Sequence, residues 1–216
     1  GMLLALGLVA ALLESKESKK GQVVDAAMTD GSALLMTMIY TMQSSGMWKT
    51  SMGSNLLDGG SHFYDTYECK DGKFISLGSI EPQFYALLCQ IAELDESIFG
   101  NQMSRDSWPE QKEAIKKIIL DKTRDEWCEL MEGTDVCFAP VLDMSEAPKH
   151  PHNVERKTFI DLEGVTQPAP APRFSRTEPE VVSSPSVVGE HTDEVLTSIG
   201  FSDEDINTLK TSGAVA

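Results

Sequence analysis

The sequence predicts a mixed α/β protein, and three observations carry that prediction. An apolar run, residues 2–13, indicates a helix. Two segments with alternating apolar residues, 63–69 and 73–77, flank Lys70-Asp71-Gly72, and an Asp-Gly pair in that setting is a strong β-hairpin signal. Helix-start patterns follow at Pro82, at Ser107 with Glu110, and at Thr123 with Glu126. Alternating helices and strands are typical of a layered α/β fold.

The N-terminal part predicts a helix, a short strand and a second helix. The first run is apolar on all sides, as in a helix buried inside a larger body. It lacks a basic n-region and a cleavage site and is too short to span a bilayer, so we interpret it as a buried helix rather than a signal peptide. Residues 22–26 resemble a strand, and residues 29–43 have helical apolar spacing. The Gly- and Ser-rich residues 45–60 predict a linker or an active-site loop.

The rest of the chain divides into a compact middle and a proline-rich return. We expect a helix from Pro82 to about Leu94, and a strand over residues 136–142 at a sheet edge, because Pro140 cannot donate to a ladder. Seven prolines between residues 147 and 185 predict an extended connector without regular packing. Helix signals return at residues 190–196 and at Ser202. The predicted domains are therefore residues 1–58, 59–145 and 146–216.

Charge and cysteine usage limit the partners and the compartment. The net charge is -16, from 34 acidic and 18 basic residues, and such a charge disfavours nucleic acid as a partner. If the chain binds an anionic ligand, the basic groups that hold it must cluster locally or lie on another chain. The four cysteines have no metal-ligand spacing and suit a reducing compartment. His150 and His152 lack a third ligand, so no metal site is expected. With no targeting segment, we expect a soluble cytoplasmic protein without a membrane span.

Six segments, in order and across nearly the whole chain, resemble the α-methylacyl-CoA racemase branch of the family III CoA-transferases. The most specific is Gly78-Ser79-Ile80-Glu81-Pro82-Gln83-Phe84-Tyr85. The transferase branch carries a glycine-rich loop at this point, and this sequence has none. The other five segments are residues 21–28, 65–69, 139–142, 170–177 and 189–192.

The resemblance implies a fold and an activity. The fold would be a small α/β domain plus an incomplete Rossmann-like large domain, built from both ends of the chain, in an interlinked homodimer. The activity would be that of a racemase or epimerase that removes and returns the α-proton of 2-methylacyl-CoA thioesters. No cofactor is implied, because CoA is part of the substrate. In such racemases the catalytic histidine and aspartate lie upstream of Met2, so we expect a truncated chain that is inactive alone.

The resemblance also assigns candidate site residues. Glu81 matches the catalytic-site glutamate that braces the histidine, and its place between a strand end and Pro82 would turn its carboxylate toward free helix N–H groups. The simpler interpretation is a plain acidic residue at a helix start. Tyr64 and Ile80 correspond to the acyl-thioester pocket, although Tyr64 could equally pack on its strand. Met47 and Met52 are candidates for an adaptable acyl surface, and core filling is the commoner role of methionine.

Two alternatives remain open. The chain could be a non-catalytic remnant that binds acyl-CoA or forms a dimer. It could also belong to a family III CoA-transferase, although it lacks both the glycine-rich loop and the aspartate that would carry the acyl group.

Overall fold

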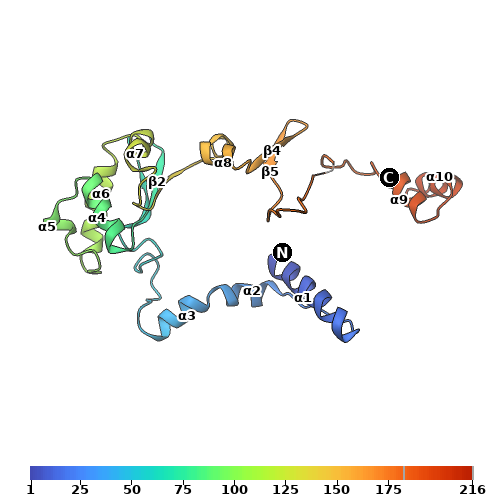
Figure 1. Cartoon of the computed structure of the whole chain (residues 1–216), viewed down its shortest axis with the longest axis horizontal. Helices are drawn as coiled ribbons and strands as arrows, with labels where there is room; N and C mark the ends of the chain where they lie inside the picture. Colours follow the sequence, from blue (N-terminus) through green and yellow to red (C-terminus); the bar gives the residue numbers. More distant parts are fainter. Residues whose placement is uncertain (182, 216) are drawn as a thin grey trace. The chain divides into compact units, whose positions relative to one another are not determined.

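The computed structural model describes residues 1–181 and 183–215. It has a mixed α/β fold, as predicted, and divides into two compact units, residues 1–141 and 142–216 (Figure 1). Across the described residues, no helix is both long enough and apolar enough to cross a membrane.

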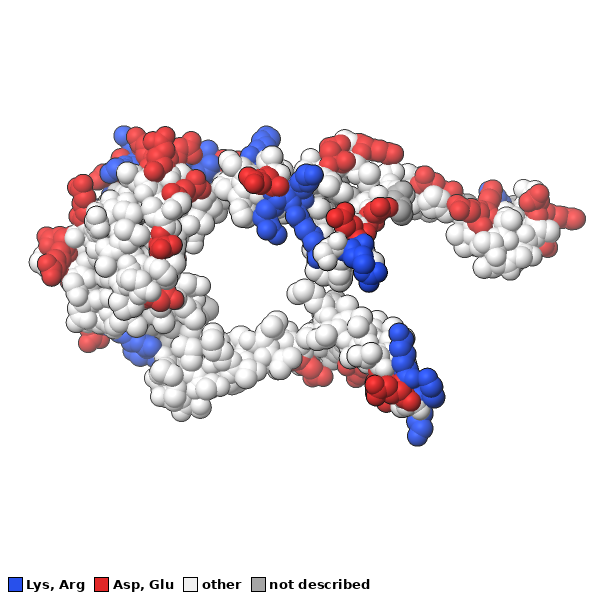
Figure 2. Space-filling view, viewed as in Figure 1, with Lys and Arg blue, Asp and Glu red and all other residues white. Residues whose placement is uncertain are grey.

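The first unit begins with a helical arm, residues 1–44, made of α1 (Met2–Ser18), α2 (Met28–Leu35) and α3 (Thr37–Ser44). The helix predicted from the first apolar run is confirmed and ends at Lys19, whose φ of 61° is left-handed. The predicted burial of that helix is not found within this chain, because no residue of α1, α2 or α3 is buried. The surface over α2 and α3 is mostly uncharged (Figure 2).

Two predictions for the arm are wrong. Residues 22–26 form no strand, and Val23 is 94 % exposed. A strand needs a ladder partner, and no described segment pairs with these residues. The helix predicted over residues 29–43 is interrupted at Met36, which has φ −83° and ψ 2°. There the Thr37 hydroxyl donates to the Leu34 carbonyl oxygen at 2.6 Å, a local bond that competes with the helical pattern.

The loop between the arm and the sheet is closed around one buried side chain, Asn55. Its Oδ1 accepts from the Lys49 N–H at 2.7 Å, and its Nδ2 donates to the Lys49 carbonyl at 3.0 Å. Asp58 accepts from both the Asn55 backbone and the Asn55 amide at 2.7 Å. Burial opposes ionisation of Asp58, but these bonds, with others from Ser54 and Gly60, outweigh it and lower the Asp58 pKa. The loop is therefore tied together by hydrogen bonds.

The central α/β module, residues 61–141, contains an antiparallel sheet of order β1-β2-β3. The predicted hairpin is confirmed as β1 (Tyr64–Glu68) and β2 (Phe74–Gly78), with Gly72 at φ 73° in the turn. The predicted edge strand is confirmed as β3 (Phe138–Val141), which contains Pro140. Tyr67, Ile75 and Leu77 are buried on the inner face, and Tyr64, Thr66, Ser76 and Gly78 alternate with them.

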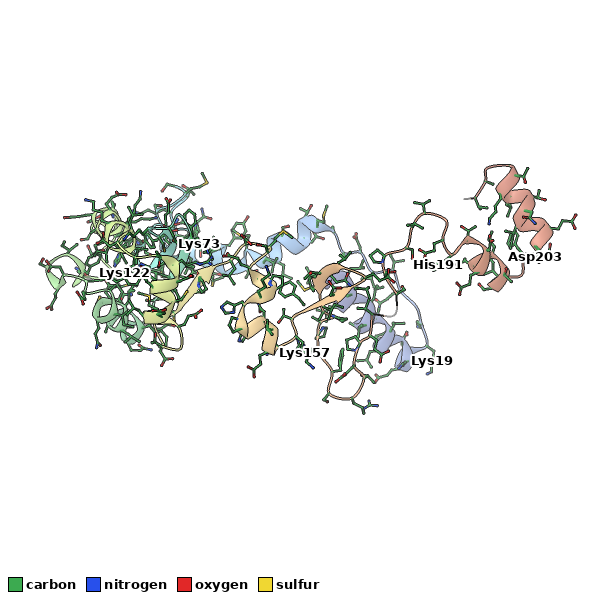
Figure 3. All side chains as sticks on the ribbon, turned by 90° about the horizontal axis from the view of Figure 1, so that it is seen from above. Lys19, Lys73, Lys122, Lys157, His191 and Asp203 are labelled. Carbon is green, nitrogen blue, oxygen red and sulfur yellow. The ribbon has the colours of Figure 1, made fainter. Side chains whose placement is uncertain are left out.

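Four helices complete the module and supply most of its core. They are α4 (Pro82–Ile91), α5 (Glu96–Phe99), α6 (Trp108–Ile119) and α7 (Arg124–Met131). Trp127 is buried, with its indole N–H donating to the Ile119 carbonyl at 2.9 Å. Side chains are densely packed around Lys73 and Lys122, and the Lys122 ammonium lies 4.9 Å from the centre of the Trp127 ring (Figure 3).

The two capping predictions for this module have different outcomes. Thr123 and Glu126 form a complete capping box at the start of α7, as predicted. Ser107 precedes α6, but the capping-box prediction there is wrong. Its backbone is already helical (φ −87°, ψ −18°), so its hydroxyl does not reach the first turn and bonds Ser104 Oγ at 3.1 Å instead.

The second unit contains more regular structure than the predicted connector. Asp161 Oδ1 accepts from the Gly164 N–H at 3.0 Å and closes a hairpin that the sequence analysis missed. The Ser202 side chain, with Asp205, caps the last helix, as predicted. His191 precedes the helix before it, and Asp203 begins the last (Figure 3). The elements are η1 (Ala147–Lys149), α8 (Pro151–Glu155), β4 (Phe159–Leu162), β5 (Val165–Pro168), α9 (Thr192–Ser198) and α10 (Asp203–Thr211).

Candidate functional site

Glu81 lies where β2 passes into α4. It is the residue directly before the helix, with an extended backbone (φ −71°, ψ 142°), and the predicted helix start at Pro82 is confirmed. The carboxylate is exposed and makes no capping hydrogen bond, contrary to the expected contact with the helix N–H groups. Glutamate is not among the residues preferred at a helix N-cap, which are Ser, Thr, Asp, Asn and Gly.

Ser79 and Ile80, the two residues before Glu81, are held by hydrogen bonds to residues from three other parts of the chain. The Ser79 N–H donates to the Phe63 carbonyl at 3.0 Å, and the Ser79 hydroxyl donates to the Val136 carbonyl at 2.5 Å. The side-chain amide of Gln102 donates to the carbonyls of Ser79 and Ile80, at 3.0 and 2.9 Å. Ser79 is fully buried, so each of these bonds satisfies a group that water does not reach.

A buried histidine, His62, lies beneath this segment and was missed by the sequence analysis. The Tyr85 hydroxyl donates to the Phe99 carbonyl at 2.8 Å, so at 2.8 Å from His62 Nε2 it accepts the imidazole N–H. His62 Nδ1 is then unprotonated, and it has no hydrogen-bond partner. Burial lowers the His62 pKa to about 4. A neutral, fully buried ring does not reach a substrate, so His62 is a structural residue.

A pocket of about 470 Å³ opens on the outer face of the sheet. Tyr64, which is 36 % exposed, lines it beside Gly78, its partner across β1 and β2. A Cβ added at Gly78 would lie 3.8 Å from Tyr64 Cε2, so the tyrosine ring covers the glycine. The residues that line the pocket are Leu57, Asp58, Gly59, Tyr64, Asp65, Thr66, Ser76, Leu77, Gly78, Cys137, Phe138 and Ala139.

Cys137 lines this pocket, and the charge of Glu81 affects the pKa of its thiol. Its carbonyl accepts from the Gly78 N–H at 2.8 Å, and Cys137 is an exposed residue that lines the pocket. Partial burial, and after it the negative charges of Glu81 and Asp135, raise the pKa of the Cys137 thiol above its ordinary value. Gly78, which also lines the pocket, precedes Glu81 by three residues in the chain.

The other predicted substrate-contacting residues lie elsewhere. Ile80 is half-buried and packs against the core, and it is not among the residues that line the pocket on the sheet. Met47 is exposed, and its carbonyl accepts from Arg105 Nη2 at 2.6 Å. Met52 is 95 % exposed. Of the five predicted site residues, Tyr64 lines the pocket and Glu81 follows the pocket-lining Gly78 by three residues, and the roles of all five stay predictions.

The chain belongs to CoA-transferase family III, whose profile matches residues 1–192. It is similar to the α-methylacyl-CoA racemases of Mus musculus and Homo sapiens, with 46 % and 42 % identity over 212 residues, or 97 % of this chain. The chain spans 55 % of the length of each of these relatives. Its fold matches the solved structure of a CaiB/BaiF family protein from Brucella suis, with a TM-score of 0.67 and 18 % identity, over 92 % of this chain and 53 % of that one.

Proposed function

We propose that this chain is part of a racemase that acts on 2-methylacyl-CoA thioesters, and that Glu81 is its contribution to the catalytic site. The observation that carries the proposal is the 46 % and 42 % identity to two α-methylacyl-CoA racemases over 97 % of the chain. The exposure of Glu81, three residues after the pocket-lining Gly78, agrees with it.

The chemistry requires a proton to leave one face of the α-carbon and another to return to the opposite face. A thioester makes that carbon acidic enough for one of two groups, a histidine or a carboxylate, to remove the α-proton while the other returns a proton. A glutamate that accepts from the second nitrogen of the histidine fixes its tautomer and raises its basicity. In our proposal Glu81 has this role, because its carboxylate is not engaged in capping α4. Tyr64, Ile80, Met47 and Met52 would contact the acyl thioester.

The two parts that flank the module would complete a larger assembly. We propose that residues 59–145 form the small domain, and that residues 1–58 and 146–216 belong to a Rossmann-like large domain of an interlinked homodimer. The unburied apolar residues of α1, α2 and α3 support this, because they need a partner to leave water. With a net charge of -16 here, the basic groups that hold the CoA phosphates would come from the rest of the assembly.

The test is α-proton exchange by the full-length gene product. One epimer of a 2-methylacyl-CoA is incubated in D₂O, and both deuterium incorporation and the epimer ratio are followed. We expect exchange with racemisation, reduced about 10²-fold or more by Glu81→Gln. The matched control is Glu110→Gln, which changes an exposed glutamate in the first turn of α6 and should leave the rate unchanged.

The remaining outcomes separate the alternatives. Transfer of CoA to a carboxylate acceptor without α-exchange would identify a CoA-transferase of the same family. Calorimetric binding of the acyl-CoA with neither activity would indicate a non-catalytic binding protein. Equal losses in the Glu81 and Glu110 variants would reduce Glu81 to an ordinary acidic residue at a helix start.

A further inference from the structure

We infer that Gln102 is the positioning residue for Glu81, which rests on the proposed function of Glu81. Its side-chain amide has two N–H groups, and each donates to a different carbonyl, Ser79 O at 3.0 Å and Ile80 O at 2.9 Å. These are the last two carbonyls before Glu81 in the chain. The amide therefore fixes the orientation of the peptides from which the Glu81 side chain projects.

Gln102 is itself held in place by α6. Its carbonyl accepts from the Trp108 indole N–H at 2.8 Å, and the Trp108 ring is buried. Gln111, one turn further along α6, donates from its amide to the Ile98 and Asn101 carbonyls at 2.9 and 3.3 Å. Trp108 thus holds Gln102 directly, whereas Gln111 bonds to α5 and to the residue before Gln102.

Glutamine suits this position better than any similar side chain. Methionine has about the same length but no donors, asparagine is one methylene shorter, and glutamate would set two acceptor oxygens against two carbonyl oxygens. A displacement of about 1 Å of a group in a catalytic site can cost about 10²-fold in rate. Loss of the two Gln102 hydrogen bonds should therefore lower the reaction rate by displacing the Glu81 carboxylate.

The first experiment is a double-mutant cycle in the full-length gene product. We expect Gln102→Met to lower kcat for α-proton exchange about tenfold, with KM within about twofold, because remote positioning acts on the chemical step. Gln102→Glu should be lower still. In the Glu81→Gln background, Gln102→Met should change the rate by less than about twofold, because its effect passes through the carboxylate already removed.

Gln111→Met is the matched control, since it also removes an amide bonded to two backbone carbonyls, those of Ile98 and Asn101, and it leaves both Gln102 bonds to Ser79 and Ile80 available. It should lower the melting temperature at least as much as Gln102→Met and reduce kcat less. If the loss of kcat is in the same proportion to the loss of melting temperature in both variants, the inference is overturned. So would a Gln102→Met effect of the same factor with and without Glu81.

A second measurement needs no catalysis and so separates this inference from the proposed function. Alkylation of the exposed Cys137 thiol, followed against pH, reports the nearby Glu81 charge. Glu81→Gln should lower the Cys137 pKa. Gln102→Met should change the Cys137 pKa, whereas Gln111→Met should leave it unchanged. A Cys137 titration that Gln102→Met leaves unchanged would overturn the positioning role even if the protein shows no exchange.

Discussion

The helical arm and the central α/β module are both rich in apolar residues, yet only one of them has a core within this chain. Leu88, in α4 of the module, is fully buried, whereas Leu12, in α1 of the arm, is 64 % exposed. Both residues lie in helices that the sequence predicts. The comparison shows that apolar content predicts a helix, whereas burial depends on which partner the helix meets.

The difference lies in how apolar residues are distributed. In the module, alternation in β2 directs Ile75 and Leu77 to one face, and α4, α6 and α7 contribute residues to the core that includes them. In the arm, residues 2–13 of α1 are apolar on all sides, and the described chain buries none of them. A helix of this kind is suited to the interior of a larger body, which agrees with the chain spanning 55 % of its relatives.

The largest contrast should come from one substitution made in both regions. Leu88→Ala removes a fully buried side chain and should lower the free energy of unfolding by about 2–5 kcal/mol. Leu12→Ala, in the isolated chain, should change it by less than about 0.5 kcal/mol, because the side chain is already exposed and alanine favours helix. Urea unfolding followed by tryptophan fluorescence measures both, since Trp108 and Trp127 are buried in the module. Similar values for the two variants would break the comparison.

A smaller effect should appear with pH, through His62. Its folded-state pKa, about 4, lies below the ordinary 6.5, so the unfolded chain binds the proton more tightly. The contribution of His62 to the free energy of unfolding is therefore fully present above pH 6.5. It falls by roughly 3 kcal/mol in total as the pH drops from 6.5 to about 4.

His62→Gln is the control for this pH dependence, because its amide can still donate to Tyr85 and does not titrate. The difference between the two stability curves isolates the histidine from the carboxylates that also titrate near pH 4. Parallel curves between pH 6.5 and 4 would show that His62 is not held neutral in the folded module.

The features predicted from the sequence are those set by near neighbours. Asp71-Gly72 fixes the hairpin, Pro82 fixes the start of α4, and Thr123 with Glu126 fixes the start of α7. Each of these signals acts within a few residues, so the local sequence carries it.

The features that were missed depend on distant contacts. Gln102 meets Ser79 across 23 residues, His62 meets Tyr85 across 23, and the Ser79 hydroxyl meets Val136 across 57. No local pattern marks a glutamine that bonds two remote carbonyls. The wrong strand over residues 22–26 has the same origin, because a β-branched run forms a strand only where a partner strand pairs with it.

Amide hydrogen exchange on the monomeric 216-residue chain, repeated on the larger assembly proposed above, tests the central comparison most directly. In the isolated chain, the amides of β2, α4, α6 and α7 should be strongly protected, while those of α1, α2 and α3 should exchange orders of magnitude faster, since unsupported helices of this length are marginal. In the proposed assembly, both regions should be protected. Strong protection of α1 to α3 in the isolated monomer, or fast exchange across the module, would contradict the account.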